Sequence, residues 1–124
     1  MIKGIGVDII EIERIKEAVK KHGPSFLTKV FTANEIKYCR NRKAIRFPEL
    51  AVRFAAKEAY AKAIGTGITG FGRSNHGLGW REIEVTNNAL GKPALKIKGK
   101  SSGKVQVSLS HSRDYAVAMV YVEK

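Results

Sequence analysis

The sequence is poor in cysteine, proline, tryptophan and acidic residues, and these scarcities narrow the class of protein. Its 124 residues contain one cysteine, Cys39, so an internal disulfide is excluded and a reducing compartment is expected. No apolar run approaches the length of a membrane span, and Met1–Gly4 begin a strand pattern instead of a signal peptide. We therefore expect a cytoplasmic protein without a membrane partner.

The scarcity of acidic residues is the most informative one. The sequence has 11 aspartates and glutamates and 23 lysines and arginines, which gives a net charge of +12. Residues 12–50 alone hold ten basic residues against four glutamates. Such an excess favours an acidic partner, whether a nucleic acid, an acidic protein or a polyphosphate ligand. The alternative is a basic surface that is merely solvated. The 44% hydrophobic and 27% charged contents fit one globular domain over residues 1–124.

The first part of the chain has the patterns of one strand followed by helices. β-branched residues predict the strand, and apolar residues at helical spacing predict the first helix, which Gly23 and Pro24 end. The predicted elements are a strand over residues 2–10, a helix over 11–22, a short apolar turn over 26–31, and a helix that a capping box at 32–35 begins and that continues to about residue 42.

A longer helix is predicted from Pro48 to Ile64, because proline suits a first helical turn and Gly65 suits a helix end. Four alanines recur along it at successive i+4 positions, namely Ala51, Ala55, Ala59 and Ala63. A ridge of such small side chains lets the helix backbone approach another element closely.

The remainder of the chain predicts a loop and then strands. Residues 65–79 contain six of the twelve glycines and lack the pattern of a nucleotide-binding loop, which indicates a long surface loop. Strands are predicted over residues 80–86, 94–97, 105–109 and 115–122. The last of these is continuously apolar, as is typical of a strand buried on both faces. Helices followed by strands indicate the α+β class.

Two carboxylates are candidate metal ligands, namely Asp8 at the end of the first strand and Glu58 on the long helix. Lys62 lies one helical turn from Glu58 on the same face. A hard divalent cation prefers carboxylates, and a phosphorylated substrate is neutralised by that cation together with lysines. The alternatives are a strand-end cap for Asp8 and a solvated ion pair for Glu58 and Lys62.

Four segments resemble the motifs of holo-acyl-carrier-protein synthase, the short bacterial type of 4′-phosphopantetheinyl transferase. They are Gly4–Ile12, Phe31–Glu35, Arg53–Ala59 and Ser108–Ser112, and the resemblance spans residues 4 to about 122 in the expected order. It implies a mainly antiparallel sheet packed with the long helix, plus N-terminal helices. It also implies transfer of 4′-phosphopantetheine from coenzyme A to a serine of apo acyl carrier protein, with release of adenosine 3′,5′-bisphosphate, in support of fatty acid biosynthesis.

The resemblance further implies that Asp8 and Glu58 bind magnesium, and that Asp8, Glu58 and Lys62 are the catalytic residues. The acceptor of the serine proton stays open among Glu58, a metal-bound water and Lys62. Longer members of the superfamily carry D-x-E at the first site, whereas this chain has Asp8-Ile9-Ile10. A water is therefore expected in place of a third carboxylate, as in the short homotrimeric type, whose sites form between subunits.

Substrate and partner contacts also follow from the resemblance. The implied coenzyme A contacts are Arg53, Lys57, Lys62, Gly65, Thr66, Gly91, Lys92, Pro93, Ser110 and His111. Among these Lys57 is expected at the periphery of the phosphates, while a plain hairpin turn at 91–93 and a turn-capping role for His111 are the alternatives. Arg14 matches the carrier-docking arginine of the family, and Lys20 and Lys21 match less tightly.

A small nucleic-acid-binding module is the competing interpretation. It would combine the basic surface with Tyr38, Phe47 and Tyr60 as stacking platforms. The sequence carries no recognised nucleic-acid-binding motif, and this interpretation leaves Asp8 and Glu58 unexplained. We therefore expect coenzyme A and apo acyl carrier protein as partners, and no nucleic acid.

Overall fold

The computed structural model describes residues 1–42, 44–69 and 78–124. The elements in chain order are β1 (Ile2–Glu11), α1 (Ile12–His22), α2 (Pro24–Val30), α3 (Ala33–Cys39), α4 (Phe47–Ile64), β2 (Ile68–Thr69), β3 (Leu78–Gly79), the 3₁₀ helix η1 (Trp80–Glu82), β4 (Ile83–Asn87), β5 (Pro93–Ile97), β6 (Lys100–Ser101), β7 (Val105–His111) and β8 (Tyr115–Glu123). The α+β prediction is confirmed. Most of the loop expected over 65–79 lies outside the described residues.

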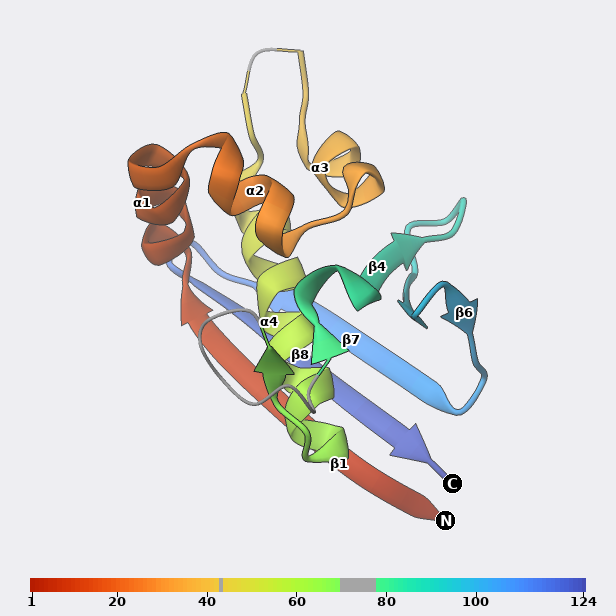
Figure 1. The fold of residues 1–124 in the computed structure, drawn as a ribbon. Coiled ribbons are helices and arrows are strands. Elements are labelled where there is room, and N and C mark those ends of the chain that lie inside the picture. Colours follow the sequence, from red (N-terminus) through yellow and green to blue (C-terminus); the bar gives the residue numbers. More distant parts are fainter. Residues whose placement is uncertain (43, 70–77) are drawn as a thin grey trace.

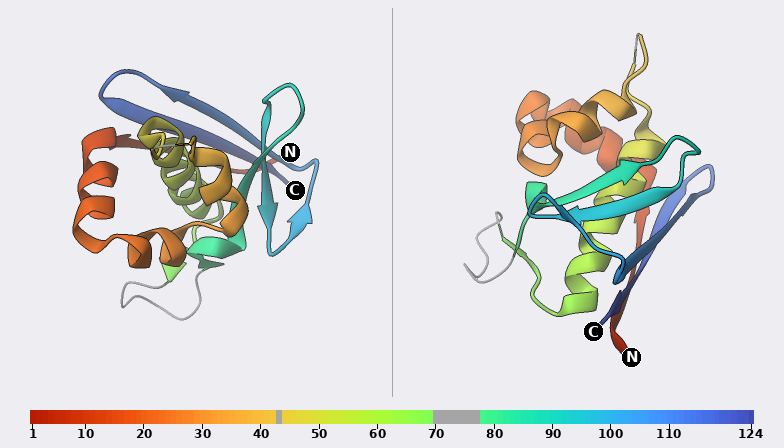
Figure 2. Two further views of the ribbon diagram at one scale, coloured as in Figure 1. Left: turned by 90° about the horizontal axis from the view of Figure 1, so that it is seen from above. Right: turned by 90° about the vertical axis from the view of Figure 1, so that its right-hand side faces the viewer.

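The main sheet consists of three antiparallel strands in the order β1-β8-β7, so the N-terminal strand pairs with the C-terminal one. Helix α4 crosses one face of this sheet, and α1, α2 and α3 lie beyond it (Figure 1). A second antiparallel sheet, β4-β5-β6, flanks α4 on another side. Figure 2 shows α4 enclosed between the main sheet and the other elements, which makes it the centre of the core.

The contact between β1 and α4 is unusually close because glycine and alanine meet there. A Cβ atom placed on Gly6 would lie 2.0 Å from the carbonyl oxygen of Ala59, and one on Gly4 would lie 1.9 Å from that of Ala63. All four alanines of the predicted ridge are buried. The close approach expected of that ridge is confirmed, and its partner is β1.

Local stop and start signals set most of the helix boundaries. Gly23 ends α1 with φ of 55°, and Gly65 ends α4 in the left-handed region with φ of 78°. The predicted capping box is present, because the Thr32 side chain accepts from the Glu35 N–H and the Glu35 side chain accepts from the Thr32 N–H.

Three elements differ from the sequence prediction. The apolar turn expected over 26–31 is the helix α2, because Pro24 begins a new helix directly after Gly23. Helix α3 ends at Cys39, where the Cys39 carbonyl accepts from Arg46 N–H and turns the chain back. The strand expected from residue 80 begins with the 3₁₀ turn η1.

Strand β8 is buried on one face only, so the prediction of burial on both faces is wrong for the single chain. Ala116, Ala118, Val120 and Val122 face α4 and are buried. The other face of the β1–β8 pair keeps large apolar side chains 49–65% exposed, and we call it the outer face; it comprises Ile5, Val7, Ile9, Tyr115 and Met119. The helices cover one side of the sheet, and no described element of the chain covers the outer face (Figure 2).

Candidate active site

Strand β1 brings Asp8 to the long helix. Side chains alternate along a strand, so Asp8 shares the α4 side of β1 with Gly4 and Gly6. The Lys62 Nζ atom donates to Asp8 Oδ1 at 2.9 Å and to the Val7 carbonyl at 3.1 Å. The Asp8 side chain is 16% exposed and that of Lys62 is 54% exposed. Two residues that lie 54 positions apart in the sequence are thereby brought together.

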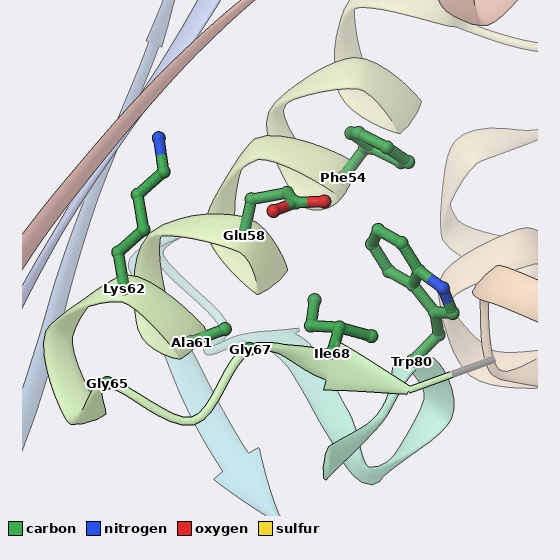
Figure 3. A pocket seen from close by; sticks show the side chains of 8 residues that line it. All are labelled: Phe54, Glu58, Ala61, Lys62, Gly65, Gly67, Ile68 and Trp80. Carbon is green, nitrogen blue, oxygen red and sulfur yellow. The ribbon is translucent and has the colours of Figure 1, made fainter. Parts of the chain in front are cut away.

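A cavity of about 630 Å³ adjoins this ion pair, and we call it the Glu58 cavity. Among the described residues that line it, the ionisable ones are Glu58 and Lys62, which lie one turn apart on α4 as predicted. In Figure 3 the Glu58 carboxylate points into the cavity, whereas the Lys62 amine extends to one side. The remaining lining residues are apolar or glycine: Phe54, Ala61, Gly65, Gly67, Ile68 and Trp80.

The donor set at this end of α4 fits magnesium. Asp8 and Glu58 supply carboxylates from β1 and α4, and both belong to the surroundings of Lys62. Magnesium uses one or two protein carboxylates and completes its octahedron with water and phosphate oxygens. Within 1–42, 44–69 and 78–124, no cluster of three or more His, Cys, Asp or Glu side chains that could hold a metal ion is present.

A second cavity, of about 390 Å³, lies between the β4–β5 turn and the end of β7, and we call it the His111 cavity. Four of the residues expected to bind coenzyme A line it, namely Gly91, Pro93, Ser110 and His111. Gly91 has φ of 87° in a tight turn that the Asn88 side chain stabilises by accepting from Leu90 and Lys92 N–H groups. Lys92 is exposed and lies outside the lining of this cavity.

Arg53 supports the His111 cavity from within the core, because its side chain is only 1% exposed. Its guanidinium donates to Glu49 at 3.1 Å and to Asn87 Oδ1 at 2.5 Å, and it lies 4.2 Å from the centre of the Tyr38 ring. Those three partners line the cavity, whereas Arg53 does not. The direct coenzyme A contact expected of Arg53 does not fit this burial, and the residue holds the cavity wall instead.

Lys57 requires a correction, because its side chain is fully buried and cannot reach a phosphate at the surface. The Nζ atom donates to Glu35 Oε1 at 2.7 Å, to the Trp80 carbonyl at 3.0 Å and to the Ile83 carbonyl. Burial lowers the pKa of Lys57, and the carboxylate of Glu35 opposes that shift. The expected peripheral phosphate contact of Lys57 is therefore wrong for this structure.

The other predicted residues lie at the edge of the Glu58 cavity or on α1. Gly65 lines the Glu58 cavity, and Thr66 follows it as an exposed residue. Arg14, Lys20 and Lys21 are exposed on α1, and Arg14 lies 3.9 Å from the carboxylate of Glu11.

The sequence analysis missed the apolar wall of the Glu58 cavity. Phe54 and Trp80 stack with ring centres 4.8 Å apart, and both line the cavity beside Ile68. One signal was available, since Phe54 precedes Glu58 by one helical turn and must share its face. No local pattern placed the tryptophan beside it.

The aromatic platforms of the nucleic-acid interpretation are not available together. Tyr60 is 8% exposed and belongs to the core. The ring of Tyr38 already carries the guanidinium groups of Arg46 and Arg53, at 5.0 and 4.2 Å from its centre.

Of the helices in the described residues, none is both long and apolar enough to cross a membrane.

Comparison with known proteins assigns the class. The family model of the 4′-phosphopantetheinyl transferase superfamily matches residues 4–120. A holo-[acyl-carrier-protein] synthase of Chloroherpeton thalassium is 47% identical over 123 residues, which cover 96% of each chain. The chain therefore belongs to the holo-[acyl-carrier-protein] synthase family of 4′-phosphopantetheinyl transferases.

Solved structures agree with this assignment. The synthase of Bacillus anthracis in complex with coenzyme A (3′,5′-ADP) is similar with a TM-score of 0.79 and 40% identity, covering 100% of this chain and 98% of that one. The synthase of Helicobacter pylori in complex with coenzyme A gives a TM-score of 0.78 and 28% identity, covering 96% of this chain and 99% of that one. The fold and the family are thus shared over the full length.

Proposed function

We propose that this chain transfers the 4′-phosphopantetheine group of coenzyme A to a serine hydroxyl of an apo acyl carrier protein and releases adenosine 3′,5′-bisphosphate. This reaction supports fatty acid biosynthesis. The observation that carries the proposal is the contact of Asp8 with Lys62, which lines the Glu58 cavity together with Glu58, in a chain that is similar over its full length to synthases solved with coenzyme A.

In this reaction the serine oxygen attacks the phosphorus that carries pantetheine. The bond from that phosphorus to the bridging oxygen of the diphosphate breaks, and the bridging oxygen leaves with adenosine 3′,5′-bisphosphate. Negative charge spreads over the oxygens of both phosphates, so catalysis depends mainly on positioning and charge neutralisation. Magnesium held by Asp8 and Glu58 supplies part of that neutralisation when it is bound.

Lys62 supplies the mobile positive charge. Its side chain is 54% exposed, so the ammonium group can exchange its contact with Asp8 for a phosphate oxygen when coenzyme A enters. The serine proton leaves through a group at the cavity, and the ionisable lining residues in the described part of the chain are Glu58 and Lys62. Phe54 and Trp80 exclude water from one wall, which strengthens every charge interaction inside.

The acidic partner docks on α1 in this proposal. Arg14 follows Asp8 by six residues, is exposed, and offers a forked donor to a carboxylate of the carrier protein. Lys20 and Lys21 extend the basic face to the end of the same helix. The net charge of +12 steers an acidic carrier toward the enzyme.

We further propose a homotrimer in which coenzyme A lies across each subunit boundary. The exposed outer face supports this assembly, because apolar side chains such as Ile5, Val7 and Ile9 gain free energy when a second copy covers them. Among the described residues, the Glu58 cavity and the His111 cavity of one chain share no lining residue, which suits a ligand that touches two subunits.

Two further assignments belong to the same proposal. Residues 1–124 form one transferase domain, because α4 packs on strands from both ends of the chain. The single buried cysteine suits the reducing conditions of the cytoplasm.

Substitution of the carboxylates tests the function. Asp8→Ala and Glu58→Ala should each abolish transfer in an assay that follows carrier modification by mass spectrometry, while circular dichroism stays that of the wild type. EDTA should silence the wild type, and magnesium should restore it. Glu123→Ala, at the exposed far end of β8, is the matched control and should keep full activity. Full wild-type activity in metal-free buffer would contradict the assignment of Asp8 and Glu58 as magnesium ligands.

A further inference from the structure

A buried ion pair beside the Glu58 cavity has no part in the chemistry described above. The side chains of Lys57 and Glu35 are both 0% exposed. Lys57 Nζ has three hydrogens, and it has three acceptors: Glu35 Oε1 at 2.7 Å, the Trp80 carbonyl at 3.0 Å, and the Ile83 carbonyl. Each hydrogen of the ammonium group therefore has a protein acceptor. Two of the three acceptors are backbone carbonyl oxygens of one short segment, residues 80–83.

The carboxylate of Glu35 ties two more backbone segments to the same point. Its Oε1 atom accepts from Thr32 N–H at 3.0 Å, which begins α3, and its Oε2 atom accepts from Val85 N–H at 2.9 Å on β4. The pair thus connects α4, the start of α3, η1 and β4. Apart from the contact between Lys57 and Glu35 themselves, each of these contacts is to backbone, so the pair fixes the path of the chain as well as the packing of side chains.

The segment that Lys57 holds carries one wall of the Glu58 cavity. Trp80 contributes its carbonyl to Lys57 and its ring to the cavity, where the ring stacks on Phe54 (Figure 3). Lys57 and Glu58 are consecutive on α4, and consecutive helical side chains point about 100° apart. The Lys57 side chain therefore enters the core, while the Glu58 side chain enters the cavity. Because Lys57 binds the segment that carries Trp80, it also sets the position of the Phe54–Trp80 wall relative to Glu58.

The stability of the fold alone does not require an ion pair here, because replacing a buried ion pair with well-packed hydrophobic residues is often neutral or stabilising. Such residues would not accept or donate hydrogen bonds, and the carbonyls of Trp80 and Ile83 would lose their donor. We propose that Lys57 and Glu35 are positioning residues that hold residues 80–83, and with them the Phe54–Trp80 wall, at the distance from Glu58 that coenzyme A requires. This inference rests on the proposed function.

The test uses Lys57→Met, which keeps most of the length of the side chain without the terminal amine and removes all three donated hydrogen bonds. We expect the KM for coenzyme A to rise about tenfold, while the KM for the carrier protein stays within about twofold, because the wall loses its backbone anchor. Trp80 is the one tryptophan of the chain, so its fluorescence reports the wall directly. Its emission should shift to longer wavelength and become more accessible to acrylamide.

Control variants separate positioning from general loss of stability. Val122→Ala truncates a buried side chain at the far end of β8 and should leave both the coenzyme A KM and the Trp80 emission unchanged. The exchange Glu35→Lys with Lys57→Glu restores an ion pair but places a carboxylate against two carbonyl oxygens, so it should not rescue the KM. Rescue by this exchange would overturn the proposal, because the pair would then act through its charge alone.

Glu35→Gln provides a second arm if Lys57→Met does not fold at the assay temperature. It keeps an acceptor for Lys57 and loses an acceptor for Val85 N–H, and a rise of about threefold in the coenzyme A KM is expected. A folded variant of either kind with wild-type KM and wild-type Trp80 emission would refute the inference. If the wild type neither bound coenzyme A nor modified a carrier, the proposed function would fail, and the Trp80 emission would still decide whether the pair holds the wall.

Discussion

Substitution of Gly6 by alanine tests the dependence of the active site on the close packing of β1 against α4. The new Cβ atom would lie 2.0 Å from the carbonyl oxygen of Ala59, whereas ordinary contacts begin at 3.4 Å. The strand must therefore retreat by roughly 1.4 Å, the difference between those two distances. Overpacking costs about 1–3 kcal/mol of unfolding free energy, and the upper end is expected because the obstructing atoms belong to helix backbone.

The same retreat should impair catalysis in molecules that remain folded. Asp8 lies two residues beyond Gly6 on the same side of β1, so it moves away from Lys62 and Glu58 with the strand. A misplacement of about 1 Å at a reacting centre can cost about a hundredfold in rate. We expect a loss of this size in kcat, measured well below the unfolding temperature of the variant.

Urea unfolding followed by circular dichroism measures the stability term, and carrier modification measures the rate. Gly103→Ala is the matched control, because a Cβ atom there meets nothing within 4 Å, and its effect should stay within about 0.5 kcal/mol. The packing argument would be refuted if the Gly6→Ala variant had the same urea midpoint of unfolding and the same kcat as the wild type.

Further predictions concern the thiol, the docking helix and the assembly. Burial raises the pKa of Cys39 from 9.0 to about 11. A disulfide reagent at pH 8 should therefore label this thiol only as fast as the chain unfolds. Labelling at the rate of free cysteine would contradict its burial. The folded chain keeps this proton when the unfolded chain loses it near pH 9, so unfolding free energy should fall between pH 9 and 11, and fall less in Cys39→Ala. Arg14→Glu should raise the carrier KM about tenfold and spare the coenzyme A KM, and rising salt should slow carrier association with the wild type; equal loss of both substrates would place α1 in the nucleotide site. Sedimentation should give a trimer, and inactive Glu58→Ala and His111→Ala chains should regain activity when mixed, whereas a fully active monomer would refute the assembly.

Local chemistry in the sequence was sufficient for the main elements of the fold. Gly23, the capping box from Thr32 to Glu35, and the pair Pro48 and Gly65 act within a few residues of where they stand, so they predict helix boundaries without knowledge of the tertiary structure. The alanine ridge also predicted a close helix contact. Its partner, β1, was not predicted, because the two glycines that accept the helix lie more than forty residues away in the sequence.

The side-chain environments depend on distant residues and could not be read from the pattern. Lys57 and Glu58 are neighbours with similar sequence surroundings, and only the packing of α4 against Glu35 and Ile83 sends Lys57 into the core. The apolar run of β8 was interpreted as burial on both faces. The chain supplies cover for one face, and a sequence pattern does not say whether the other cover comes from the same molecule.

The alternation of β1 has an evolutionary consequence. Gly4, Gly6 and Asp8 lie on the α4 side of the strand, whereas Ile5, Val7 and Ile9 form part of the outer face. Substitutions at the odd positions can therefore change the outer face while the even positions keep the packing on α4 and the contact of Asp8 with Lys62. An insertion or deletion of one residue exchanges the two sets at once, so this strand tolerates changes of residue type far better than changes of length.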